Sequence, residues 1–163
     1  MITRDRLTQL VLYNPINGQF VWRRSISGHI KQGCFAGSLN RQGYWTLRLD
    51  TEYYLAHRVA WFWVYGEWPK GEIDHINSNR QDNRIDNLRD VTRSINQHNG
   101  RPYRNNKSKL KGVTYLKARR KWMAQIQRDK KHYYLGLYDT KEEAHAAYCA
   151  GAARHYGKFA RTE

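Results

Sequence analysis

The chain has 163 residues, of which 29 are lysine or arginine and 14 are aspartate or glutamate, so its net charge is +15. Hydrophobic residues make up 40% and aromatic residues 13%, which excludes a wholly disordered chain and allows one ordinary domain or two small ones. The sequence contains no apolar run long enough for a membrane-spanning helix, and its N-terminus has no apolar core of a signal peptide. We therefore expect a soluble intracellular protein without a membrane partner.

The positive charge is unevenly distributed. Residues 1–100 contain 13 basic and 9 acidic residues, for a net charge of +4, whereas residues 101–163 contain 16 and 5, for +11. Such a field favours a polyanionic partner, because each neutralised phosphate releases condensed counterions. Neither an amphipathic basic helix nor a lipidation signal is visible, so nucleic acid is favoured over a membrane surface.

The first 71 residues mix helical and strand patterns. Leu7, Leu10 and Val11 follow a helical period and predict an opening helix. Further along, alternation and turn residues predict short strands at 19–23, 43–49 and 52–55. The apolar stretch 56–66 is too long for an edge strand and predicts a buried helix that ends at Gly66.

Residues 72–99, EIDHINSNRQDNRIDNLRDVTRSINQHN, contain six asparagines and one Asp-His pair. Their pattern predicts strand, loop, strand and a short helix capped by Thr92. Asp74 is a hard oxygen ligand suited to Mg²⁺, and His75 can take a proton from water near neutral pH. Phosphodiester hydrolysis needs both functions, and a downstream asparagine such as Asn96 could add a ligand or orient the imidazole.

This run, together with GSLNRQGYWTLRLD, AHRVAW and YGEWP upstream, resembles the phage and intron-encoded HNH homing endonucleases over roughly residues 8–100. The resemblance implies a ββα-metal motif at about 72–100, with Asp74 as metal ligand and His75 as general base. It implies that Asn87 holds the loop and orients the histidine, and that Asn96 is the metal ligand on the helix. His98 and Asn99 are alternatives for that last ligand, whereas His57 and His29 are interpreted as structural.

The remaining residues predict a linker and a second small domain. Gly, Pro, Asn, Lys and Ser at 100–110 are typical of a flexible linker. Alternating runs within 111–138 predict a three-stranded antiparallel meander, and Thr140 with Glu143 predicts a capping box for the helix that follows. The alternation places Leu135 and Leu137 on one face with Tyr133, and Gln125 with Gln127 on an open face ringed by basic residues.

This second stretch resembles the plant APETALA/ethylene-response-factor DNA-binding domain over about 110–160, through KGV, KWMAQI, YYLGLYDTKEEAHAAY and GKFA. The resemblance implies DNA contacts by seven residues: Lys111, Thr114, Lys117, Arg119, Gln125, Gln127 and Tyr134. Thr114 and Gln127 stand where the plant domains place arginines, so the plant target sequence does not transfer.

These observations predict an α+β protein with an HNH nuclease domain at 1–100, a linker at 101–110 and, at 111–163, a three-stranded sheet packed on one helix. We expect a monomeric, homing-type endonuclease that hydrolyses double-stranded DNA in the cytoplasm of a bacterial or phage-infected cell. It would use Mg²⁺ or Mn²⁺ and no other small-molecule cofactor. A DNA-binding regulator with an inactive nuclease fold is the main alternative, and an RNA-binding protein ranks last.

Overall fold

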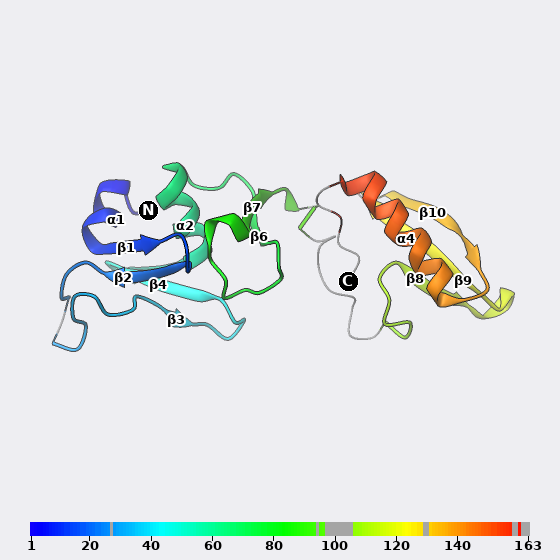
Figure 1. Cartoon of the computed structure of the whole chain (residues 1–163), viewed down its shortest axis with the longest axis horizontal. Coiled ribbons are helices and arrows are strands. Elements are labelled where there is room, and N and C mark those ends of the chain that lie inside the picture. Colours follow the sequence, from blue (N-terminus) through cyan, green and yellow to red (C-terminus); the bar gives the residue numbers. More distant parts are fainter. Residues whose placement is uncertain (27, 94, 97–105, 129–130, 158–159, 161–163) are drawn as a thin grey trace. The chain divides into compact units, whose positions relative to one another are not determined.

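The computed structural model describes residues 1–26, 28–93, 95–96, 106–128, 131–157 and 160. The chain forms two compact units, Met1–Val91 and Thr92–Glu163 (Figure 1). Helices and sheets occur together in the chain, as the sequence predicts. Among the described residues, no helix combines the length and the apolarity needed to cross a membrane.

The first unit opens with a helix followed by a hairpin. Helix α1 (Arg4–Leu10) begins where the Thr3 hydroxyl accepts a hydrogen bond from the Arg6 amide, and it buries Leu7 and Leu10. Strand β1 (Val11–Asn14) then pairs antiparallel with β2 (Gln19–Trp22). The helical interpretation of Val11 is wrong, because its buried side chain belongs to β1 and shares the core with the helix.

A three-stranded antiparallel sheet and a buried helix complete the core of this unit. Strands β3 (Ser38–Leu39), β4 (Trp45–Leu49) and β5 (Glu52–Leu55) lie in that order, and α2 (Ala56–Tyr65) follows directly. The helix ends at Gly66, whose φ of 77° is a left-handed conformation that glycine adopts without strain. The predicted strands at 43–49 and 52–55 and the predicted buried helix are confirmed, within a residue or two at their ends.

The asparagine-rich segment forms a hairpin at the end of the first unit. Strand β6 (Glu72–His75) pairs antiparallel with β7 (Leu88–Val91), which places Asp74 opposite Arg89 and His75 opposite Leu88. The loop between them closes through a 3₁₀ turn, η1 (Ile85–Asn87). In the second unit, the Thr92 hydroxyl accepts a hydrogen bond from the Ile95 amide at 3.4 Å, in agreement with the predicted cap.

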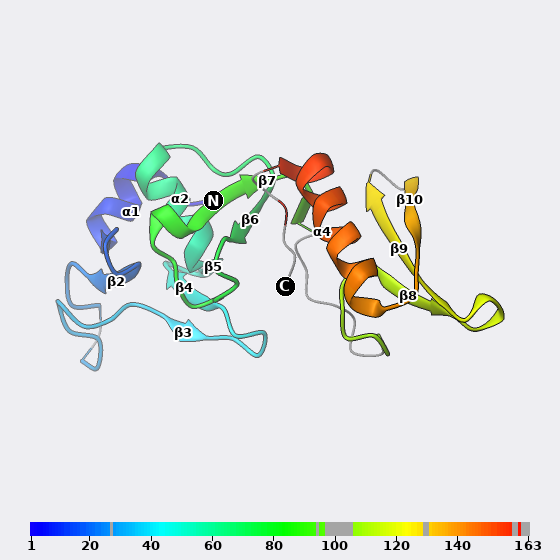
Figure 2. The ribbon, with the colours of Figure 1, turned by 45° about the vertical axis from the view of Figure 1, so that its right-hand side comes forward.

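The second unit contains a meander and a long helix. Strands β8 (Val113–Leu116), β9 (Lys121–Arg128) and β10 (Lys131–Tyr138) form an antiparallel sheet in the order β10-β9-β8. Helix α4 (Lys141–Tyr156) lies across one face of this sheet in Figure 2, and its buried Ala144 and Tyr148 join the strand residues in the core. Both hydrogen bonds of the predicted capping box, between Thr140 and Glu143, are present.

A β-bulge changes the predicted faces of β10. The register shifts between Tyr134 and Gly136, so that Gly136 lies opposite Ala124 and Leu137 lies opposite Met123. Because the side chains of a strand alternate, the extra residue moves Leu137 to the face opposite the helix, while Leu135 packs in the core. The prediction that Leu137 shares the face of Leu135 is therefore wrong.

Candidate functional site

His75 ends β6 with its imidazole turned into a polar loop. The side chain is 5% exposed, and its Nε2 lies 3.1 Å from the Asn83 Oδ1. An amide oxygen can only accept a hydrogen bond, so Nε2 carries the proton and Nδ1 keeps a lone pair. Burial lowers the pKa of His75 below the usual histidine value, although the bond to Asn83 and the charge of Asp74 act in the opposite direction. The imidazole is therefore neutral and oriented at neutral pH.

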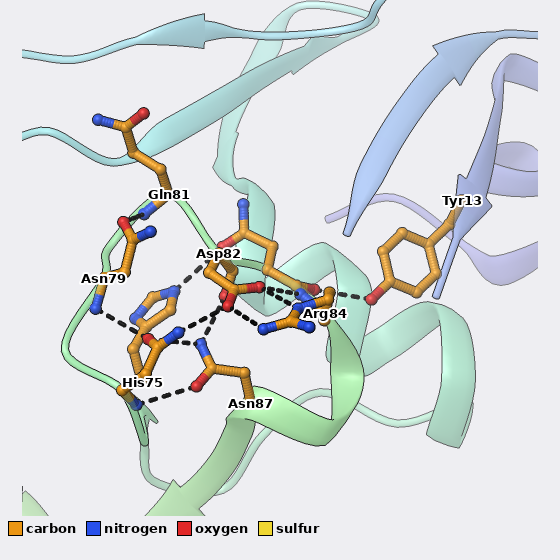
Figure 3. A network of polar contacts seen from close by, with 9 residues as sticks. Tyr13, His75, Asn79, Gln81, Asp82, Arg84 and Asn87 are labelled. Carbon is orange, nitrogen blue, oxygen red and sulfur yellow. Dashed lines mark hydrogen bonds and ion pairs between the residues drawn. The ribbon is translucent and has the colours of Figure 1, made fainter. Parts of the chain in front are cut away.

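Asn83, for which the sequence predicted no role, is itself held in place by residues of the first hairpin. It is only 1% exposed, and its backbone carbonyl accepts a 2.7 Å hydrogen bond from the buried Tyr13 hydroxyl. Gly18 packs so closely against this segment that a Cβ there would lie 2.4 Å from the Arg84 nitrogen. Figure 3 shows Tyr13 reaching the loop from the first hairpin while His75 stands within it. Residues far upstream of the Asp-His pair thus position the partner of His75.

Asn87 holds the loop closed. Its Oδ1 accepts from the Asn77 amide at 2.9 Å, and its Nδ2 donates to the Asn77 Oδ1 at 3.0 Å and to the Asp82 carbonyl at 2.8 Å (Figure 3). Asp82 in turn forms an ion pair of 2.6 Å with Arg84, and this hydrogen-bonded pair lowers the pKa of Asp82 to about 2. Asn87 thus contacts other residues of the loop, whereas the side chain at the imidazole nitrogen is that of Asn83.

Asp74 is directed to the other side of β6. Its carboxylate Oδ2 accepts hydrogen bonds from the Arg89 Nε at 2.8 Å and the Arg89 Nη2 at 2.7 Å, and the residue is 8% exposed. Successive strand residues point to opposite faces, so the carboxylate and the imidazole have different neighbours. Asp74 is a buried, oriented oxygen donor, which is the chemistry that Mg²⁺ requires. Among the described residues, no group of three or more His, Cys, Asp or Glu side chains could hold a metal.

The expected second metal ligand belongs to the other unit. Asn96 donates its backbone amide to the Thr92 carbonyl at 3.0 Å, as in a helical turn. His98 and Asn99, the alternative ligands, lie outside the described residues. The pairing of Asp74 with Asn96 at a metal stays a prediction.

Two aromatic side chains border the imidazole of His75. The His57 ring meets it edge-on, with centroids 5.1 Å apart and an interplanar angle of 87°, and the Tyr44 ring lies 6.0 Å away. Burial lowers the pKa of His57 to about 3, with additional contributions from His75 and Arg58. His57 Nδ1 is buried without a hydrogen-bond partner in the described part of the chain. His57 was interpreted as structural, and the structure places it directly against the candidate base.

The open face of the sheet in the second unit gathers most of the predicted DNA contacts. Gln125 lies opposite Tyr134 and Gln127 opposite His132 across β9 and β10, while Thr114 lies opposite Met123. Tyr134 is 63% exposed. The non-basic members of the predicted set of DNA contacts therefore share this face: Thr114, Gln125, Gln127 and Tyr134.

The basic candidates lie in the segments on either side of β8. Lys117 and Arg119 are exposed in the 3₁₀ turn η2 (Lys117–Arg119) between β8 and β9. Lys111 precedes β8, and its carbonyl lies 3.4 Å from the His145 Nδ1. The turn thus presents positive charge at the edge of the polar surface, which is suited to phosphate binding.

Comparison with known proteins gives two matches. Residues 54–98, from the end of β5 into the segment after Thr92, match the family model of the HNH endonuclease domain. The chain is also 32% identical over 106 residues to Protein 3.8 of Escherichia phage T7, an alignment that covers 64% of this chain and 87% of the phage protein. The family match contains Asp74, His75, Asn83, Asn87 and Asn96, whereas Tyr13 precedes it.

Proposed function

Because the chain belongs to the HNH endonuclease family, whose domain its residues 54–98 carry, we propose that it is a metal-dependent endonuclease that hydrolyses phosphodiester bonds in double-stranded DNA. The observation that carries this proposal is the buried, neutral imidazole of His75 with its Nε2 held by Asn83. A phage relative supports action in the cytoplasm of a bacterial or phage-infected cell, where the DNA lies.

His75 is the general base in this proposal. Its Nδ1 takes a proton from a water molecule, and the water oxygen forms a bond to phosphorus. The bond between phosphorus and the 3′-oxygen breaks, and that oxygen takes a proton from solvent. Asn83 keeps the proton on Nε2 during the reaction, and Asn87 keeps the loop in the conformation that brings Asn83 to the imidazole.

Asp74 and Asn96 would hold the divalent metal ion, Mg²⁺ or Mn²⁺. Their donor chemistry fits, since one carboxylate and one amide oxygen are a usual protein contribution to a Mg²⁺ site that is completed by water and phosphate. When bound, the ion supplies positive charge that stabilises the phosphate and the leaving 3′-oxygen. Arg89 orients the Asp74 carboxylate through its paired N–H groups.

The second unit is proposed as the sequence-recognition module, with residues 111–163 as an APETALA-like domain joined by the linker 101–110. Its open face offers amide side chains that can pair with adenine and an exposed tyrosine, Tyr134, that can pack on sugar or base. The adjacent basic groups would bind phosphates: Lys111, Lys117 and Arg119. Two linked modules read a longer site than one module can, as a homing-type enzyme requires.

The direct test is a nicking assay on supercoiled plasmid with Mg²⁺ or Mn²⁺. We expect the wild-type protein to relax the plasmid and His75→Ala to lose roughly 100-fold or more of that rate, the usual contribution of a general base. His29→Ala removes an exposed histidine of the same unit and should cleave like the wild type.

The alternative is a DNA-binding regulator with an inactive nuclease fold. The ion pair between Asp74 and Arg89 favours it, because the carboxylate already has a cationic partner. If wild type and His75→Ala both bind DNA and neither nicks it with any divalent metal, the regulator is correct and the enzyme is excluded.

A further inference from the structure

Arg80 lies in the loop that follows His75 and is held by neutral groups. Its guanidinium carbon stands 4.9 Å from the centroid of the Tyr44 ring, and its Nη1 donates a 2.8 Å hydrogen bond to the Gln42 carbonyl. The residue is exposed to solvent. A stacked and hydrogen-bonded guanidinium has lost much of its freedom, although no carboxylate takes part in fixing it.

Three other arginines of this unit differ in this respect, whereas Arg4, Arg23 and Arg58, like Arg80, donate to backbone carbonyls. Arg6, Arg84 and Arg89 each form an ion pair with a carboxylate, at 2.6, 2.6 and 2.7 Å. Within the described residues, the contacts of Arg80 include no carboxylate. The positive charge of Arg80 is therefore uncompensated, and its guanidinium group is held in one orientation. Both properties are expected of a group that binds an anion.

The Tyr44 ring lies between this charge and the candidate base. The Tyr44 ring that carries Arg80 is 6.0 Å from the His75 ring, centroid to centroid. A phosphate brought to the water at His75 thus comes into the field of a fixed guanidinium.

We infer that Arg80 binds the phosphate group of the DNA that lies at His75, a role that rests on the proposed nuclease function. The planar guanidinium donates paired N–H groups to phosphate oxygens, and its charge stabilises the negative charge that grows on them during hydrolysis. Tyr44 and Gln42 hold it in place for that contact.

The test compares Arg80→Gln, Arg80→Lys and wild type on supercoiled plasmid with Mn²⁺, at protein concentrations that saturate the DNA. We expect Arg80→Gln to lower the single-turnover nicking rate by roughly 10- to 100-fold, and Arg80→Lys to retain an intermediate rate because it keeps the charge without the fork. The salt dependence of DNA binding should also flatten by about one phosphate contact in Arg80→Gln.

Arg48 supplies a matched control. It is also exposed and stacked on a tyrosine, with its guanidinium carbon 5.8 Å from the Tyr53 ring. Arg48→Gln should nick at the wild-type rate. A wild-type rate in Arg80→Gln, or an equal loss in both glutamine variants with unchanged melting temperatures, overturns the assignment. If the wild type fails to nick, the nuclease proposal fails, and an unchanged salt dependence in Arg80→Gln then overturns the phosphate contact separately.

Discussion

The loop around His75 and the open sheet face of the second unit both consist largely of polar side chains. They differ in whether those side chains are buried or exposed to solvent. In the loop, Asn83 is 1% exposed and its amide oxygen contacts an imidazole nitrogen. On the sheet, Tyr134 is 63% exposed and Gln127 is open to solvent. The first region directs its hydrogen bonds inward, and the second presents them outward.

The difference separates chemistry from recognition. A general base needs one tautomer and one orientation, which a buried network can impose. A recognition surface adds many separate contacts, each of which must exchange water for DNA. Substitutions in the loop should therefore have large effects on cleavage, and substitutions on the sheet should have smaller effects on binding.

The largest effect is expected from Asn83→Ala. This change removes the acceptor that keeps the proton on the His75 Nε2, so cleavage of plasmid should fall by roughly 100-fold while DNA binding persists. Asn79→Ala is the matched control, because Asn79 is an exposed residue of the same loop and its side-chain oxygen accepts a hydrogen bond from the nearby Gln81 backbone amide. Equal rates for the two variants would remove the distinction between a buried catalytic network and a polar loop.

The second largest effect is expected from a lower pH, which should destabilise the fold around the buried His57. The folded-state pKa of His57 is lowered to about 3, whereas the unfolded value is 6.5, so the unfolded chain binds more protons between these values. The stability that this difference contributes is complete above pH 6.5 and decreases as the pH falls. We expect a loss of about 2 kcal/mol between about pH 6.5 and pH 5.

Urea unfolding followed by tryptophan fluorescence over this pH range measures the effect. In His57→Phe the decrease should be much smaller, because the buried titrating group is gone. An unchanged pH dependence in this variant would show that His57 is not the group responsible.

On the sheet, the double variant Lys117→Ala with Arg119→Ala should weaken DNA binding by roughly tenfold and lower the salt dependence by about two phosphate contacts. Both side chains are exposed in η2 and have no part in the His75 network. Cleavage at saturating protein should be unchanged. Arg154→Ala removes an exposed charge from α4 and is the comparison, and electrophoretic mobility shifts at several salt concentrations measure both.

The smallest effect is expected from Tyr13→Phe. The loss of its hydroxyl leaves the buried Asn83 carbonyl without that donor and should lower the free energy of unfolding by about 1 kcal/mol. A cleavage rate reduced by a few-fold would show that the first hairpin supports the site. Tyr53→Phe, at a residue 69% exposed, should change neither quantity.

Local patterns predicted much of the fold because they depend on neighbours in the chain. The capping box of Thr140 and Glu143, the end of α2 at Gly66 and the alternation of β4 are all set within a few residues. Val11 and Leu137 were placed wrongly for a different reason. One lies where a helix meets a strand, and the other follows a bulge that packing against α4 accommodates.

The sequence by itself determined the chemical inventory of this protein: an Asp-His pair among asparagines, a basic second half and the signals that start and stop most elements. Only the tertiary structure decided which asparagine meets His75, that Tyr13 supports it and that Asp74 pairs with Arg89. The physical reason is that side-chain partners in a folded core are chosen by distance and burial. Residues 70 positions apart, such as Tyr13 and Asn83, carry no local signal of their contact.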